Sequence, residues 1–122
     1  MSRTAGLLLA LAACGAPNHI EQADFSARMA DVLCARTREC LRGLYDASYF
    51  GDADCRATAE RTLDGIVDDF ASGIGDCAYD ADRAAAAWSD IAEMSCQRFY
   101  EGGYVDAVST VWNCDVYLPL GE

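Results

Sequence analysis

Apolar side chains recur every three or four residues along the first half of the chain, which is the spacing of one helix face. From residue 20 to residue 42 this stripe consists of Phe25, Met29, Leu33, Thr37, Cys40 and Leu41. Asn18 followed by Glu21 resembles a capping box, so we expect an amphipathic helix over 20–42. Residues 43–51 interrupt the period and begin and end with glycine, which predicts an aromatic-rich loop.

The helical period returns twice more along the chain. Asp52 can cap a helix over 53–72 whose apolar stripe ends at Phe70, just before two closely spaced glycines. Asp80 or Asp82 can cap a third, alanine-rich helix that continues to the glycines at 102–103. Two further helices are therefore predicted.

The last patterned segment, residues 104–113, carries Val105, Val108 and Val111 at helical spacing. We expect a fourth helix here, although its β-branched content also suits a strand. The four segments and their short connections predict an all-α fold, a small up-and-down bundle of about four helices.

The first fourteen residues follow a different pattern. Arg3 precedes an uninterrupted apolar run over 5–13, which is typical of the n-region and h-region of a signal peptide. A bilayer-spanning helix needs about 20 apolar residues, and no stretch of the chain is that long. The run ends in Leu11-Ala12-Ala13-Cys14, which resembles the lipobox of bacterial lipoproteins.

This resemblance implies a signal peptide over 1–13, a lipidated tether over 14–19 and a folded domain over 20–118. Cys14 would become the mature N-terminus and carry a thioether-linked diacylglycerol and an N-acyl chain, and two or three acyl chains anchor a protein stably. Gly15 stands where an aspartate would retain such a protein in the inner membrane, so the resemblance implies the outer membrane. The mature domain is similar in outline to small cysteine-rich lipoproteins, a similarity that assigns no residue roles.

Setting Cys14 aside leaves six of the seven cysteines, an even number. In the oxidising compartment that a signal peptide implies, six cysteines in a small domain predict three disulfides. Six reduced core cysteines are the alternative if the leader is not a signal. No C-x-x-C occurs, so neither a thioredoxin-type redox site nor a zinc ribbon is indicated. From the alternating helix directions we predict the pairs Cys40–Cys55, Cys77–Cys114 and Cys34–Cys96.

Charge and residue inventory exclude several classes of function. Twenty acidic residues face nine basic ones, all arginine, for a net charge of −11, which disfavours binding to a phosphate backbone. The chain has one histidine, His19, and no lysine, which rules out a charge-relay triad in the domain and a P-loop. His19 is expected to be a solvated tether residue, and no cofactor is expected.

Two acidic clusters could suggest chemistry. Asp80-Ala-Asp82 imitates the opening of a calcium loop but lacks the later oxygen ligands and the glycine, so helix capping is preferred. Asp64 and Asp68 lie on one helix face and could serve a carboxylate-dependent hydrolase. Nothing in the sequence supplies a cleft for them, so a solvated acidic face is preferred.

Aromatic residues near the predicted turns form the candidate partner surface, with coverage of the bundle end as the alternative. They are Tyr45, Tyr49, Phe50, Tyr100 and Tyr104. The sequence thus predicts a lipid-anchored, non-catalytic protein of the cell envelope that acts as a structural or protein-interaction module. An acidic inhibitor or immunity-type protein against a basic envelope enzyme is the alternative, because the mature chain would keep eight arginines against twenty acids, a charge of −12. The hydrolase has the least support.

Overall fold

A computed structural model describes residues 16–72 and 77–114 of the chain. The predicted signal peptide, Cys14 and residues 115–118 of the predicted domain lie outside this part. Within it, six helices and two short strands follow one another in this order: α2 (Gln22–Cys40), α3 (Arg42–Ser48), α4 (Asp52–Ser72), β1 (Cys77–Tyr79), α5 (Ala81–Glu93), α6 (Cys96–Tyr100), α7 (Gly103–Ser109) and β2 (Trp112–Cys114).

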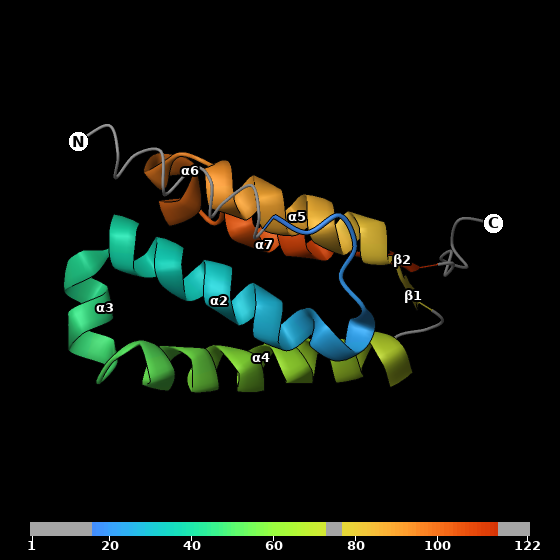
Figure 1. Cartoon of the computed structure of the whole chain (residues 1–122), viewed down its shortest axis with the longest axis horizontal. Coiled ribbons are helices and arrows are strands. Elements are labelled where there is room, and N and C mark those ends of the chain that lie inside the picture. Colours follow the sequence, from blue (N-terminus) through green and yellow to red (C-terminus); the bar gives the residue numbers. More distant parts are fainter. Residues whose placement is uncertain (1–15, 73–76, 115–122) are drawn as a thin grey trace, which may run out of the picture.

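Four of these helices form an up-and-down bundle, which confirms the predicted fold class. Helices α2, α4, α5 and α7 alternate in direction along the long axis of the molecule (Figure 1). The short helices α3 and α6 lie at one end of the bundle, and the two strands lie at the other end (Figure 1). The strands pair antiparallel with Cys77 opposite Cys114.

The predicted loop over 43–51 is wrong for most of its length, because residues 42–48 form α3. The backbone changes direction at Leu41, and the amide of Tyr45 then donates to the Leu41 carbonyl at 2.8 Å and starts the new helix. Tyr45 is buried beneath this helix. Seven residues are too few for a stable isolated helix, so the burial of this ring stabilises α3.

Two other predicted helices are shorter than expected. The third ends at Glu93, because Ser95 caps a separate helix by accepting a hydrogen bond from the Arg98 amide at 3.0 Å. The fourth ends at Ser109, and the chain then becomes extended and pairs with β1. The strand propensity noted for residues 104–113 thus applies only to the end of that segment.

The caps of the long helices agree with the predictions in part. Asp80 accepts hydrogen bonds from the amides of Asp82 and Arg83 at 3.0 Å and caps α5. The predicted capping box at Asn18 is wrong, because α2 begins after Glu21, whose side chain makes no cap bond.

The core lies between α2, α5 and the two strands. Phe25 and Met29 of α2, Ile91 of α5 and Val111 are fully buried. The Phe25 ring meets Trp112 edge-on with a centroid separation of 5.1 Å. On α5 the buried positions include the alanines at 84, 85 and 87, whose small side chains let the neighbouring helices approach closely.

The described residues contain three disulfides, as predicted, but two of the pairs are exchanged. Cys77–Cys114 is confirmed and joins the two strands. The other pairs are Cys34–Cys55 and Cys40–Cys96, in place of Cys40–Cys55 and Cys34–Cys96. The prediction assumed a simple turn between α2 and α4, whereas α3 occupies that connection. Cys55 in the first turns of α4 consequently lies against Cys34, and Cys40 at the end of α2 is left to pair with the first residue of α6.

Candidate interaction groove

The bundle is open on one of its four sides. Helix α2 packs against α4 and α5, and α5 packs against α7. Between α4 and α7 lies a hollow of about 400 Å³. Its floor is Leu33 of α2, and its walls are Tyr49, Thr58, Ala59, Thr62, Leu63, Ile66 and Phe70 on one side and Tyr104, Val105, Val108 and Ser109 on the other.

A second hollow of about 250 Å³ continues the first toward α3 and α6. The two hollows share Leu33, Tyr49, Ala59 and Tyr104, so they form one surface. The second is completed by Cys34, Thr37, Leu41, Leu44, Cys55, Phe99 and Tyr100. We call the combined surface the α4–α7 groove.

The lining of the α4–α7 groove carries no aspartate, glutamate, arginine or histidine. Several of its hydroxyl protons are already committed to the backbone of their own helices. Thr37 donates to the Leu33 carbonyl at 2.7 Å, Thr62 to the Thr58 carbonyl at 3.2 Å and Ser109 to the Asp106 carbonyl at 2.7 Å. The groove is therefore suited to an apolar ligand held by contact and shape.

The structure brings three of the five predicted partner residues together in this groove. Tyr49, Tyr100 and Tyr104 line it. Tyr45 does not, because it is buried and packs with the Cys34–Cys55 disulfide. Phe50 is fully exposed, at 100%, but it is not part of the lining.

Tyr45 instead fixes the end wall of the groove. Its hydroxyl donates to the Asp52 carboxylate, and Arg38 of α2 donates to the same carboxylate at 2.8 Å. The hydrogen bond between Tyr45 and Asp52 raises the pKa of the Tyr45 hydroxyl and lowers the pKa of the Asp52 carboxyl. These bonds tie α2, α3 and the start of α4 together, so this wall is held in place.

Sequence reasoning missed the aliphatic part of the site. Val105 and Leu44 are more than half exposed, at 56% and 58%, and both line the groove. Ile66 and Val108 also line the groove, and helical spacing alone does not separate a core face from the wall of an open groove. The helical spacing of Val105 and Val108 is the sequence feature that corresponds to this aliphatic part of the groove.

Acidic residues follow the outer side of α4 beyond the groove. From residue 60 to the end of the helix its acids are Glu60, Asp64, Asp68 and Asp69. Arg61 is the only basic residue over the same range, and the last turn has none. The two carboxylates proposed for hydrolysis, Asp64 and Asp68, are exposed and lie outside the groove lining. The α4–α7 groove therefore does not include this carboxylate pair.

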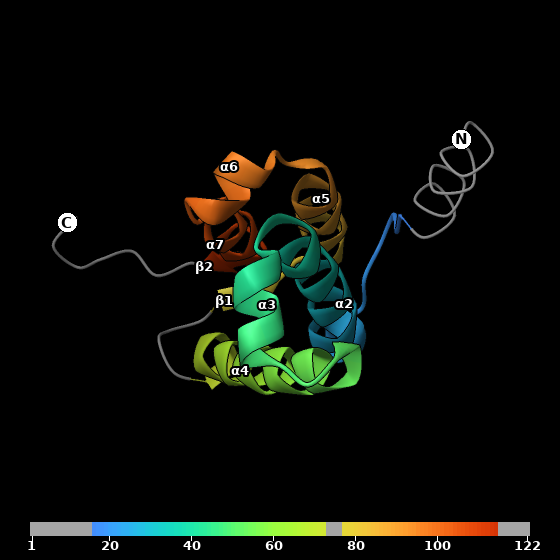
Figure 2. The same cartoon turned by 90° about the vertical axis from the view of Figure 1, so that its left-hand side faces the viewer.

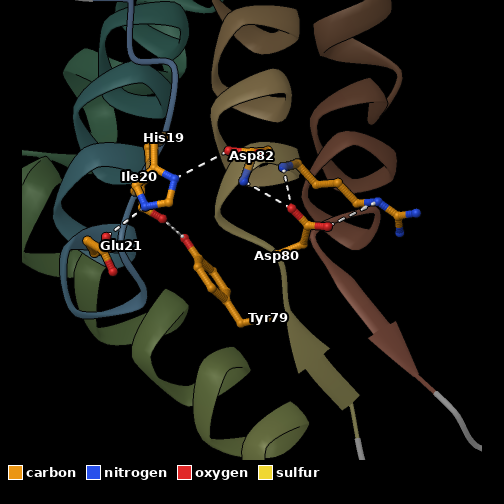
Figure 3. Close-up of polar contacts among 7 residues, drawn as sticks. His19, Ile20, Glu21, Tyr79, Asp80 and Asp82 are labelled. Carbon is orange, nitrogen blue, oxygen red and sulfur yellow. Dashed lines mark hydrogen bonds and ion pairs between the residues drawn. The ribbon is translucent and has the colours of Figure 1, made fainter.

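His19 lies away from the groove, in a clasp that fixes the start of the domain to α5 (Figure 3). His19 is exposed, as expected, and its side chain also has partners: Nε2 lies 2.7 Å from a Glu21 oxygen and Nδ1 lies 3.3 Å from an Asp82 oxygen. The hydrogen bonds with Glu21 and Asp82 raise the pKa of His19.

The neighbouring residue completes the clasp. Ile20 is fully buried, and its amide donates to the Ala81 carbonyl at 3.2 Å. Its carbonyl accepts from the Tyr79 hydroxyl at 2.7 Å (Figure 3). Burial raises the pKa of Tyr79 to about 12. The tether that precedes the domain is therefore held at Ile20.

Neither a membrane-spanning helix nor a metal centre is found among the described residues. Within residues 16–72 and 77–114, no helix is long and apolar enough to cross a membrane. In the same part of the chain, no group of three or more histidine, cysteine, aspartate or glutamate residues is arranged to hold a metal ion. No protein-family model, curated protein or solved structure matches the chain.

Proposed function

We propose that the protein is a lipid-anchored, non-catalytic module of the cell envelope that binds a partner protein through the α4–α7 groove. The observation that carries the proposal is the groove itself, which consists of two adjoining apolar hollows of about 400 and 250 Å³ without a charged lining residue. Clefts of this size with predominantly apolar walls are typical binding sites. The lone histidine is engaged in the clasp, so the groove holds neither a nucleophile–base pair nor a carboxylate pair.

The cysteine chemistry supports the envelope as the location. All six cysteines in the described residues are paired in disulfides, which form and persist in oxidising compartments. The seventh, Cys14, follows the apolar run in the lipobox-like sequence. One cysteine acylated and six oxidised accounts for the odd total.

The position of the clasp supports a presentation role. Six peptide units separate Cys14 from Ile20, and at about 3.5 Å each they span at most about 20 Å. The domain would therefore stay close to the lipid surface. Residues 16–20 leave the bundle beside α2 and α5, whereas α7 lies on the opposite side and α4 runs along the bottom of the bundle (Figure 2). An anchored domain would keep its groove turned away from its own tether.

The test is fractionation of the full chain expressed in a bacterium with an outer membrane. We expect the protein in the outer-membrane fraction, with an intact mass that corresponds to cleavage before Cys14 and addition of diacylglycerol and an acyl chain. Cys14→Ser, the matched control, should release it from membranes and leave three disulfides and no free thiol. Unchanged membrane association of Cys14→Ser, or six free thiols in the native protein, would refute the anchor.

The acidic side of α4 supports the second candidate, an inhibitor that occupies a basic enzyme through charge. The two candidates differ in what they require of the groove. An electrostatic inhibitor should lose most of its affinity in high salt and tolerate changes in the groove, whereas a groove binder should be sensitive to them.

A further inference from the structure

We infer that the α4–α7 groove receives an amphipathic helix of the partner, with an apolar stripe flanked by basic residues. The inference deepens the proposed function by naming the chemistry of the partner, and it rests on that function. Three features carry it: the shape of the groove, the charge around it and the exclusion of other occupants.

The shape fits a helix. The groove lies on the open side of an up-and-down bundle and is walled by two helices that run in the same direction, α4 and α7, with α2 as its floor (Figures 1 and 2). The α4 wall runs from Thr58 to Phe70, which is about 18 Å at about 1.5 Å per residue. A partner helix of about 12 residues matches this length, and its residues at i, i+3 or i+4 and i+7 would meet the apolar wall.

The walls supply apolar anchors at the level of the opening. Val105 of α7 is 56% exposed on one lip, and Ile66 and Phe70 of α4 are only partly buried on the other. A docked helix would remove this surface from water, which is favourable in proportion to the apolar area buried.

The charge around the groove selects a basic partner. The proposed mature chain has a net charge of −12, from eight arginines and twenty acids, so it attracts cations at long range. Near the lips, Asp69 follows the lining residue Ile66 by three positions on α4, and Glu101 precedes Tyr104 by three positions. A basic residue beside the apolar stripe of the partner would be placed to meet each of them.

The end of α4 gives this charge pattern a further reason. Carboxylates in the last turn of a helix are unfavourable, because the carbonyl end of the helix dipole is itself negative. The last turn of α4 nonetheless begins with Asp69 and contains no basic residue. Within the described residues, no hydrogen bond or ion pair involves the Asp69 side chain. A cation supplied by the partner would offset this unfavourable interaction.

The same charges argue against three other occupants. A second copy of the chain would bring an equal negative charge to the groove. Residues 115–122 of this chain contain Asp115 and Glu122 and no basic residue. A membrane surface rich in anionic lipids would be repelled. A basic helix is therefore the occupant that both the lining and the surroundings favour.

The test uses a synthetic peptide of about 14 residues with leucines at i, i+3, i+7 and i+10 and lysines beside them. Its binding to the full chain is measured by fluorescence anisotropy at low and high salt. Two peptides serve as controls: one with glutamate in place of each lysine, and one with the same composition in scrambled order. We expect binding of the lysine peptide and at least ~10-fold weaker binding of both controls.

Matched variants locate the site. Val105→Asp places a charge on the groove lip and should weaken binding ~10-fold or more, whereas Phe50→Asp, at a fully exposed position outside the lining, should leave it unchanged. Thr62→Trp fills the groove from an exposed lining position and should also weaken binding, which keeps the test valid if one variant misfolds.

A second pair of variants tests the charge. Asp69→Asn with Glu101→Gln should weaken binding ~3-fold at low salt and have no effect at high salt, where exposed charges are screened. Asp24→Asn with Glu93→Gln changes the net charge equally at exposed positions outside the groove and should have a smaller effect.

Four results would overturn the inference. The first is equal binding of the lysine and glutamate peptides, and the second is an equal effect of Val105→Asp and Phe50→Asp on peptide binding. The third is that the wild-type chain dimerises or binds anionic vesicles and that Val105→Asp abolishes this association. The fourth is a ~10-fold gain in peptide affinity when Tyr117 and Leu118 are both changed to aspartate, because residues 115–122 would then be the occupant.

The outcome is separable from that of the proposed anchor. The groove involves residues 33–109, so Cys14→Ser should bind the peptide as tightly as the wild type. Loss of peptide binding with intact lipidation would remove this partner and leave the anchor. Peptide binding without lipidation would keep the groove and remove the anchor.

Discussion

Replacing both Cys40 and Cys96 by serine should cost about 4 kcal/mol of unfolding free energy. The disulfide closes a separation of 56 residues, for which the chain-entropy relation gives about 4.2 kcal/mol at 25 °C. A shorter path exists through the Cys34–Cys55 bridge, about 48 residues long, but the weak logarithmic dependence on length changes the value by only about 0.1 kcal/mol. Neither Cys40 nor Cys96 is fully buried, so the serine replacements leave no large cavity that would add to this loss of unfolding free energy.

The loss is large compared with the usual stability of a domain, about 5–15 kcal/mol, so it is readily measured by urea unfolding followed by circular dichroism. Serine replacement of Cys77 and Cys114, which are separated by 37 residues, is the control and should cost about 3.8 kcal/mol by the same relation. Fragment mapping without reduction should find Cys40 joined to Cys96. A loss below about 1 kcal/mol, or a mapped Cys40–Cys55 bridge, would refute the reasoning.

Three further predictions use the same unfolding assay. Phe25→Ala should cost about 3–5 kcal/mol, because the ring is fully buried against Tyr79 and Trp112; a loss under about 1 kcal/mol would contradict that packing. Gly65→Ala in the exposed middle of α4 should raise the free energy of unfolding by about 0.5–1 kcal/mol, since an added Cβ meets nothing within 4 Å. Gly103→Ala should lower it, since the added Cβ would lie 2.7 Å from the Arg98 Cγ and 2.9 Å from the Arg98 carbonyl oxygen. Changes of the same sign in the two variants would contradict these environments. The hydrogen bonds of the clasp raise the pKa of His19. The contribution of His19 to the free energy of unfolding should therefore be complete below about pH 6.5 and decline as the pH rises through the higher pKa of the folded state. His19→Gln should abolish that part of the pH dependence, and an unchanged pH profile of the urea midpoint would exclude it.

The sequence was most informative where a stripe of apolar residues ran for several turns. Helices α2 and α4 have such stripes, and both begin and end within about two residues of their predicted bounds. The short elements were missed for a physical reason. Helix α3 and the two strands are too short to be specified locally and depend on burial of Tyr45 and on the Cys77–Cys114 pairing.

The exchange of disulfide partners has the same origin. The choice between Cys34 and Cys40 as the partner of Cys55 depends on how the chain passes from α2 to α4. A loop would have left Cys40 closest to Cys55, whereas α3 displaces it and brings Cys34 into position. An error in one seven-residue element therefore changed two of the three predicted pairs.

The candidate site could be predicted from the sequence only in its aromatic part. Tyrosines near predicted turns indicated a partner surface, because such rings are common at interfaces. Three of them, Tyr49, Tyr100 and Tyr104, do line the groove. Val105 and Ile66 could not be recognised, because their exposure depends on how far α4 stands from α7. That separation is a tertiary property that no local pattern encodes.

The lengths and side-chain sizes of the four bundle helices, α2, α4, α5 and α7, explain why the bundle is open on this side. Buried alanines on α5 let α2 and α7 approach it closely. Helix α4 packs against α2 and presents large side chains, Ile66 and Phe70, toward α7. Helix α7 has only seven residues and lines the groove with Tyr104, Val105, Val108 and Ser109, so it is too short to cover them along the length of α4. The apolar surface that α7 leaves uncovered on α4 is the surface to which we assign the partner helix.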